Sequence, residues 1–441
     1  MTTEQTDPAA PPAWPAPSQA WFALVVFCVT AILSYTDRHI LSLLVDPLRA
    51  SFDLSDTQVS LLQGVAFAFI YSFAGLPIGR MTDLLPRRRI IIAGVIVWSL
   101  ATLWCGFARS FEELFLARCM VGVGEAALAP AATSMIADYF PPRRRGTATG
   151  IFLMGQVAGG GMAITLGGTV LQLAQSGALA GLPLIGALEP WRATLIVLAL
   201  PGIVVALTIA ATREPPRRHL AGGQATMPLA EVIRTLGQHR ATLGPVYLGM
   251  ALLSIGDFAL QAWLPTLLSR NFSLSPGMIG VWLGPAAIVG ALVGTLGAGL
   301  LSDRLVEGGG VAARLPVAVI ASAMAVPGAL VMLAPSPGLA IAVFMIWLIM
   351  SNAAGAIGIT AVQEMAPPAV RGVALALISF FNILGGLVIG TTVTAMLTDR
   401  VYGAERLGYS MTTMALPAAL LGTLAFAAAW RAARRAPATP A

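Results

Sequence analysis

Five ionisable residues lie inside long apolar stretches of the sequence: Asp37, Arg38, Arg118, Glu125 and Asp257. An ionisable group at the centre of a membrane helix costs about 2.5–3.5 kcal/mol on insertion scales. Five such residues therefore need partners or a water-filled cavity. Two chemistries suit carboxylates and guanidinium groups in that setting, namely the carrying of protons and the binding of a charged small molecule.

Depth and helical spacing predict how four of these residues pair. At 1.5 Å of rise per residue, Asp37 lies about 14 Å below the nearer end of its helix, Arg118 about 8 Å and Glu125 about 18 Å. Arg118 and Glu125 are seven positions apart and share one helix face. We therefore predict that Asp37 pairs with Arg118 and that Arg38 pairs with Glu125.

Protons are the coupling ion that this cluster predicts. A carboxyl group in a partly dry cavity holds a proton more readily, whereas a nearby arginine favours its release. Asp37 and Glu125 are the candidate carriers, with Arg38 and Arg118 as their partners, and the four groups titrate as a coupled set. Arg118 would tune the carriers or bind substrate. The alternative is a permanently ionised network with a structural role.

Other polar residues at mid-helix positions are candidates for the wall of a substrate cavity. Asp257 falls at the depth of Asp37 in the second half of the chain, and Gln261 follows one turn later. Packing between helices is the competing explanation for each of these residues. The remaining candidates are Tyr71, Gln156, Asn352 and Asn382.

The elements that must position these residues are membrane-spanning helices. Of the 441 residues, 57% are hydrophobic and 10% charged, whereas soluble domains carry about 25% charged residues. This composition excludes a soluble enzyme, a disordered chain and a nucleic-acid-binding module. Backbone groups in lipid must be bonded internally, so spans of about 20 apolar residues form helices. The twelve predicted spans are 20–46, 57–80, 89–108, 113–137, 146–173, 191–212, 241–268, 277–301, 314–334, 338–363, 372–398 and 409–431.

The placement of arginine predicts the orientation. All 26 basic residues are arginines. If both ends of the chain are cytoplasmic, 18 arginines fall on the inner side and 6 on the outer side, in agreement with the positive-inside rule. We expect a multi-pass protein of the cytoplasmic (inner) membrane, with cytoplasmic N- and C-termini.

The sequence repeats itself at about half its length. A shift of 220 residues aligns Asp37 with Asp257 and Asp83 with Asp303, and a shift of 226 aligns 141–146 with 367–372. We predict an all-α membrane protein with 12 transmembrane helices in two six-helix halves related by pseudo-two-fold symmetry. The predicted regions are a disordered cytoplasmic tail (1–19), two helical bundles (20–212 and 241–432), a cytoplasmic linker with a short interfacial helix (213–240) and a second tail (433–441).

Several motifs of catalysis are absent from the sequence. It has no lysine, hence no phosphate-binding loop of the Gly-x-x-x-x-Gly-Lys-Ser/Thr type, and no His-Glu-x-x-His motif. The three cysteines have no Cys-x-x-Cys spacing. We expect no enzyme activity, cofactor or metal. The expected partners are the lipid bilayer and a small-molecule substrate, without nucleic acid, and the expected state is a monomer.

Two sequence motifs resemble those of the major facilitator superfamily. The segment 79–89, with Gly79, Asp83 and a basic cluster, resembles its cytoplasmic loop motif, and 118–125 resembles its helix-four motif. Within the superfamily, 35–38 and 136–140 are most similar to the spinster branch, whose eukaryotic members move lysolipids or sphingoid lipids. The resemblance implies a cytoplasmic gate made of Gly79, Asp83, Arg87, Arg88, Asp138, Arg145 and Asp303, with topology anchoring as the alternative role.

The resemblance implies the major facilitator fold and transport by alternating access. We expect proton-coupled secondary transport of a small amphipathic molecule or an organic anion. Drug antiporters of the superfamily carry Gly-Pro-x-x-Gly-Gly in helix five, and this chain has Gly159-Gly-Gly161-Met-Ala instead, without the proline. The alternatives are a multidrug or metabolite exporter, and a sensor or channel that does not transport and is built on the same fold.

Overall fold

The computed structural model of the chain describes residues 14–217, 229–305, 310–367 and 370–435. Within these residues the regular elements are all helical. Twelve of the helical segments are long and apolar enough to cross a membrane, which confirms the predicted all-α membrane fold. The observed spans begin and end within a few residues of the predicted ones. Helix α1 begins at Pro17, so the last residues of the predicted 1–19 tail are helical.

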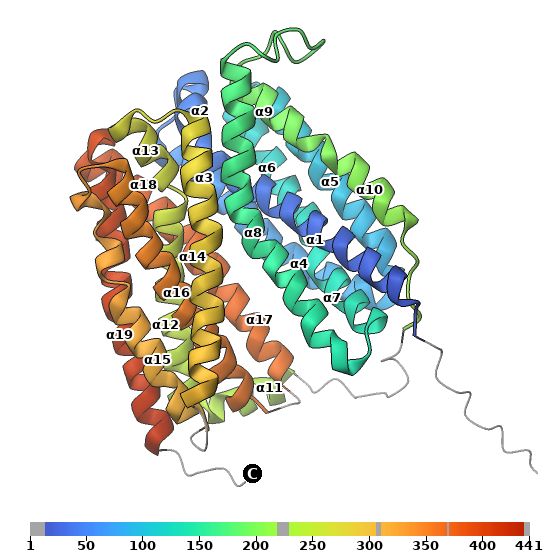
Figure 1. Ribbon diagram of the computed structural model, residues 1–441, viewed down its shortest axis with the longest axis vertical. Coiled ribbons are helices and arrows are strands. Elements are labelled where there is room, and N and C mark those ends of the chain that lie inside the picture. Colours follow the sequence, from blue (N-terminus) through green and yellow to red (C-terminus); the bar gives the residue numbers. More distant parts are fainter. Residues whose placement is uncertain (1–13, 218–228, 306–309, 368–369, 436–441) are drawn as a thin grey trace, which may run out of the picture.

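The first half of the chain forms six spans, several of which consist of two consecutive helices (Figure 1). Proline or serine marks many of their starts. Pro142 and Pro190 occupy the first turn of their helices, where the missing N–H is not needed. Ser55 and Gln58 form a reciprocal capping box. The helices are α1 (Pro17–His39), η1 (Ile40–Leu43), α2 (Val45–Phe52), α3 (Asp56–Gln63), α4 (Val65–Leu84), α5 (Arg87–Phe107), α6 (Phe111–Glu125), α7 (Leu128–Tyr139), α8 (Pro142–Gln175), α9 (Pro190–Ala199) and α10 (Pro201–Ala211).

The second half repeats this plan with six more spans. Between the halves, α11 (Leu229–Gln238) lies within the predicted linker, whose residues 218–228 are outside the described part of the chain. The helices of the second half are α12 (Arg240–Gln261), α13 (Leu264–Phe272), α14 (Pro276–Leu305), α15 (Gly310–Met324), η2 (Pro327–Ala329), η3 (Val331–Leu333), α16 (Pro337–Met365), α17 (Arg371–Asn382), η4 (Ile383–Gly390), α18 (Thr391–Leu397), η5 (Thr398–Tyr402), η6 (Ala404–Arg406) and α19 (Leu407–Arg435).

Several spans consist of more than one helical segment, among them the three that carry the ionisable residues and the eleventh. Helix α1 tightens into the 3₁₀ turn η1 directly after His39, and α12 gives way to α13 after Gln261. Helix α6 ends at Glu125, and the eleventh span contains the π-helical segments η4 and η5. Interrupted helices leave backbone groups free, and in membranes such groups occur where they face protein or a cavity.

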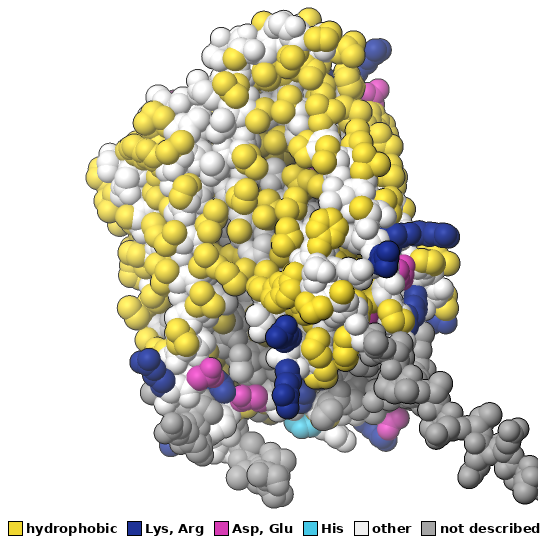
Figure 2. Space-filling view, turned by 45° about the vertical axis from the view of Figure 1, so that its right-hand side comes forward, with side chains coloured by type: hydrophobic (Ala, Val, Ile, Leu, Met, Phe, Trp, Pro, Cys, Tyr) yellow, Lys and Arg dark blue, Asp and Glu magenta, His cyan; other side chains and the backbone are white. Residues whose placement is uncertain are grey.

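The two ends of the molecule differ in how tightly the halves meet. We call the end at which α1 begins and α19 finishes the terminus side, and the opposite end the far side (Figure 1). Figure 2 shows a broad hydrophobic surface over the middle of the molecule, with many arginines at its terminus-side end. Helices α8 and α14 run side by side and join the halves.

Glycines reveal the asymmetry directly. Towards the far side, a Cβ atom on Gly64 would lie 2.3 Å from the carbonyl oxygen of Leu387, and one on Gly168 would lie 2.3 Å from that of Pro276. Both contacts cross between the halves. On the terminus side, a Cβ atom added to Gly79 or to its repeat equivalent, Gly299, would have no neighbouring atom within 4 Å. The halves are therefore in close backbone contact towards one end only.

Candidate functional site

The ion pair at the centre of the site joins α1 to the end of α6. An Arg38 guanidinium nitrogen lies 2.9 Å from Oε2 of Glu125, and the hydroxyl of Ser34 donates to the same oxygen at 2.8 Å. The Glu125 side chain is fully buried, and that of Arg38 is 9% exposed. The predicted pairing of Arg38 with Glu125 is thus present.

Aromatic rings complete the surroundings of Arg38. Its guanidinium carbon lies 4.6 Å from the ring centroids of Tyr35 and Phe67 and 5.0 Å from that of Tyr71. Such cation–π contacts are worth about 2 kcal/mol or more when the cation is desolvated. Tyr71 was predicted to line the substrate cavity, but it packs against this arginine instead.

The predicted ion pair between Asp37 and Arg118 is wrong in its geometry. Both residues are buried, but Arg118 donates to the backbone carbonyl of Asp37 at 3.0 Å and to that of Leu62 at 3.5 Å. No ion pair joins the two side chains, both of which are described. The reason is the tightening of α1 into η1, which leaves carbonyls of the last helical turn free to accept from a guanidinium.

Three atoms of this cluster have no hydrogen-bond partner among the described residues. They are Nε of Arg38, one terminal nitrogen of Arg118, and Oε1 of Glu125. Buried polar atoms in folded proteins are usually satisfied, so each of these is a place where the polar network can change. Oε1 of Glu125 is the atom at which a proton can be held without breaking the existing bonds to Oε2.

A cavity of about 200 Å³ lies between the two halves, next to this cluster. Sites for drug-sized molecules typically have volumes of about 300–1,000 Å³, so the cavity in this conformation suits a small molecule or one end of a larger one. The predicted residues Gln156, Gln261 and Asn352 line it. His39, next to the ion-paired Arg38 in the sequence, also lines the cavity and lies between the rings of Tyr35 and Phe258.

Asp257 and Asn382, also predicted to line the cavity, do not do so in this conformation. The carboxylate of Asp257 instead accepts hydrogen bonds from the indole of Trp347 and the hydroxyl of Ser351, both at 2.7 Å. The 226-residue shift between the halves takes Glu125 to Ser351. The second half therefore has a hydroxyl where the first has the carboxylate of Glu125, and no ion pair to Asp257 occurs among the described residues.

On the terminus side, Arg87 is the centre of a buried network. Its guanidinium pairs with Asp138 and donates to Ser134 at 2.9 Å, and it lies 3.4 Å from a carboxylate oxygen of Glu214. The arginine is 1% exposed. These partners belong to the first half and to the start of the linker, so the network ties α5, α7 and the segment after α10 together and does not latch the halves.

The other predicted gate residues take different roles. The Asp83 side chain is exposed and does not pair with Arg87 or Arg88, and its backbone carbonyl accepts from Arg217. Arg88 donates to the carbonyl of Thr212 at 2.7 Å, just beyond the end of α10. Asp83 therefore does not join Arg87 and Arg88 in one cluster in this conformation, because Arg87 pairs with the buried Asp138 on α7 instead. Arg145 is half-buried and makes no ion pair with a described residue.

The second half contains a matching network around Arg314. The guanidinium group of Arg314 lies 2.8 Å from Asp303 and 2.8 Å from Glu364. The shift of 220 residues takes Asp83 to Asp303, and the shift of 226 takes Asp138 to Glu364. The same offsets that predicted two halves therefore lead to Glu364, which the motifs alone did not reveal, and Arg314 occupies the centre of this network as Arg87 does in the first half.

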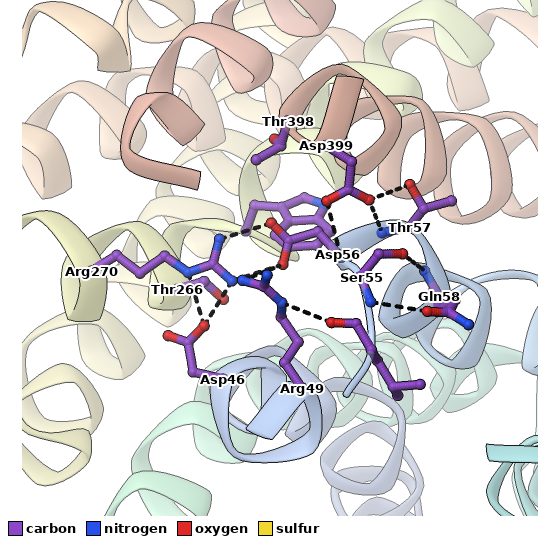
Figure 3. Close-up of polar contacts among 12 residues, drawn as sticks. Asp46, Arg49, Ser55, Asp56, Thr57, Gln58, Thr266, Arg270, Thr398 and Asp399 are labelled. Carbon is purple, nitrogen blue, oxygen red and sulfur yellow. Dashed lines mark hydrogen bonds and ion pairs between the residues drawn. The ribbon is translucent and has the colours of Figure 1, made fainter. Parts of the chain in front are cut away.

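On the far side, ion pairs connect the two halves (Figure 3). Arg270 on α13 donates to both carboxylate oxygens of Asp56, at 2.8 and 2.7 Å, and to Asp46 at 2.8 Å. Asp56 is fully buried. Among the ion pairs of the described residues, those that cross between the halves are the ones made by Arg270.

A second carboxylate reinforces this closure from η5. Asp399 accepts from the backbone N–H of Thr57 at 2.7 Å and from its hydroxyl at 2.6 Å, and from the N–H of Asp56 at 3.2 Å. These N–H groups form the first turn of α3, where a negative charge is favourable. We call Asp46, Asp56, Thr57, Arg270 and Asp399 the far-side latch.

The comparisons with known proteins agree on one family. The family model described as Major Facilitator Superfamily matches residues 27–390. An "MFS-type efflux pump" of Mycolicibacterium smegmatis is 26% identical over 438 residues, which cover 95% of this chain and 94% of that protein. Protein spinster of Drosophila melanogaster is 26% identical over 280 residues, covering 61% of this chain and 44% of that protein.

Solved structures give the same result. A bacterial homologue of the human lysosomal transporter Spinster, in an inward-facing and unoccupied conformation, superposes with a TM-score of 0.80 at 26% identity. The match covers 95% of this chain and 98% of that one. A D-xylose–proton symporter shares the fold, with a TM-score of 0.69 at 16% identity, over 91% of this chain and 97% of that one.

Proposed function

The chain belongs to the Major Facilitator Superfamily, resembling its spinster branch, and we propose that it is a proton-coupled secondary active transporter of a small amphipathic molecule or an organic anion. The observation that supports this most is the cavity between the halves, which the far-side latch and the close glycine contacts seal towards one end only. Transport by alternating access requires such a cavity, because the two halves must rock around it.

The orientation follows from charge. We assign the terminus side to the cytoplasm, because 17 arginines of the described residues belong to that side and 6 to the far side. The chain is then a multi-pass protein of the inner membrane, and this conformation faces inward. The similarity to an inward-facing spinster homologue agrees with this assignment.

Proton uptake at Glu125 is the coupling step that we propose. A protonated Glu125 no longer neutralises Arg38, whose guanidinium is 2.9 Å away. Arg38 lies on the ring of Tyr35, and that ring also lines the cavity. An anionic group in the cavity is then attracted to a cation that has lost its partner. The proton and the anion therefore stabilise each other's binding and move together.

Asp37 and Arg118 form the second part of the coupling site. Arg118 holds the carbonyl of Asp37, so its guanidinium stays beside the interruption of α1 while the carboxylate of Asp37 remains buried close by. A rocking motion that straightens or bends this junction changes the distance between carboxylate and guanidinium. The protonation of Asp37 thereby depends on which side of the membrane the cavity faces.

The test compares one intramembrane carboxyl residue of each half, Glu125 and Asp257. Thermal-shift screening of lysolipids, fatty acids and aromatic acids selects a ligand, whose uptake is then followed in proteoliposomes. Glu125→Gln should abolish accumulation driven by a pH gradient and retain exchange of ligand across the membrane. Asp257→Asn, which keeps an acceptor for Trp347 and Ser351, should leave accumulation close to that of the unaltered protein. Full accumulation in Glu125→Gln would contradict proton coupling at this site.

Export of a cationic or neutral drug is the second candidate. It is favoured by the efflux pump of Mycolicibacterium smegmatis, which matches nearly the whole chain. A positively charged substrate would compete with Arg38 for Glu125, so its binding would accompany proton release. The direction of proton movement on addition of ligand, followed with a pH-sensitive dye inside the liposomes, distinguishes this exchange from the joint movement of proton and anion.

A further inference from the structure

A groove of about 510 Å³ opens on the outer face of the first half, away from the cavity between the halves. Helices α4 and α5 both pack on α6 but hardly touch each other, and the groove lies between them. Its walls are Met81 and Leu85 on α4 and Ala93 and Val97 on α5, and Val123 on α6 contributes to its floor. The lining is almost entirely apolar.

The floor of the groove is formed where α5 packs closely on α6, and the groove above this contact stays open. A Cβ atom on Gly94 would lie 2.7 Å from the carbonyl oxygen of Gly124, so α5 and α6 are in backbone contact there. Met81 is 41% exposed and Leu85 45% exposed, which means that the walls face the bilayer and not the protein interior. Apolar surface of this kind is available to a lipid chain.

One arginine of the basic cluster stands at the mouth of the groove. Arg87 is buried in its network, and Arg88 binds carbonyls near the end of α10. Arg89 lines the groove and is exposed, and it makes no ion pair or hydrogen bond with a described residue. From Arg89 to Val97 the groove follows about two turns of α5, or about 12 Å into the membrane.

We propose that this groove is a binding site for an anionic phospholipid. One acyl chain occupies the apolar channel, and the phosphate lies on the guanidinium of Arg89. Guanidinium groups bind phosphate through directed, charge-assisted hydrogen bonds. The combination of a membrane-facing apolar channel and a basic mouth fits a lipid of the leaflet on the terminus side better than a soluble anion, which has no use for the channel. The site is separate from transport and does not depend on the proposed cargo.

The experiment uses the delipidated full-length protein in detergent. Native mass spectrometry and thermal melting are recorded with phosphatidylglycerol, with phosphatidylcholine of the same acyl chains, and with inorganic phosphate. We expect a retained one-to-one adduct and a higher melting temperature with phosphatidylglycerol, a weaker effect with phosphatidylcholine and none with phosphate. Arg89→Gln should weaken phosphatidylglycerol binding on the order of tenfold, the effect of removing one charge-assisted contact.

Three further variants separate the groove from charge alone. Ala93→Phe, at an exposed position that lines the channel, should block the binding of both lipids. Arg89→Lys should retain the preference for phosphatidylglycerol, and Arg144→Gln, an exposed arginine of the same side outside the groove, should bind like the unaltered protein. Equal binding of both lipids, unchanged binding in Arg89→Gln, or an equal effect of inorganic phosphate would overturn the proposal.

Discussion

At the scale of single residues, three consecutive arginines have different surroundings and different roles. Arg87, Arg88 and Arg89 form a run in the sequence, yet the first is buried among carboxylates, the second binds carbonyls and the third faces lipid. The pairing of Arg38 with Glu125 could be predicted from depth and spacing. The position of Arg118 could not, because it depends on a carbonyl that becomes free only where α1 tightens.

Removing the buried arginine of this run should destabilise the protein most. Arg87→Ala deprives Asp138 of its guanidinium partner in a buried setting, and the breaking of a buried pair typically costs about 3–5 kcal/mol. Thermal melting in detergent should show a clear decrease for Arg87→Ala. Arg89→Ala is the matched control and should melt close to the unaltered protein, since its side chain is exposed. Equal melting temperatures for the two variants would show that the Arg87 network does not stabilise the folded protein.

At the scale of elements, apolar periodicity predicted the spans but not their interruptions. Twelve runs became twelve spans because length and hydropathy alone decide whether a segment crosses the bilayer. The end of α1 at His39 has no glycine or proline at the junction to mark it, whereas Pro265 in the first turn of α13 follows the end of α12. The interruption of α1 arises from tertiary packing, and for this reason it could not be predicted from the apolar pattern.

The glycine contacts between α8 and α14 offer a test at this scale. A side chain on Gly168 would collide with the backbone of Pro276 and Gly280, so Gly168→Val should force these helices apart on the far side. Spin labels at Arg109→Cys and Arg406→Cys, exposed positions in the two halves, report this separation after the native cysteines are replaced. A longer distance is expected. Gly146→Val, where no atom lies within 4 Å, is the control and should leave the distance unchanged.

At the scale of the whole molecule, three polar networks define the observed conformation. One lies inside each half, and the third joins the two halves. The networks of Arg87 and Arg314 make each half rigid on the terminus side, and the far-side latch holds the two halves together. The sequence predicted a gate on the terminus side but gave no sign of the latch, because contacts between halves depend on the conformation. Rocking must break the latch to open the far side.

The latch is therefore the most direct place to test alternating access. Arg270→Gln removes both charge-assisted hydrogen bonds to the buried Asp56, which keeps the longer ion pair with Arg49 at 3.4 Å. The closed far side then loses about 1.5–3 kcal/mol, which shifts the ratio of the two conformations by on the order of ten- to a hundredfold. Arg192→Gln is the matched control, because Arg192 pairs with Glu189 on the same side but within one half.

The decisive measurement is the pair of inter-half distances by electron paramagnetic resonance in Arg270→Gln. Labels at Arg109→Cys and Arg406→Cys report the far side, and labels at Arg144→Cys and Arg371→Cys report the terminus side. We predict that the far-side distance lengthens while the terminus-side distance shortens, and that Arg192→Gln changes neither. Distances that stay fixed on both sides, or lengthen on both, would contradict two halves that rock around a central site.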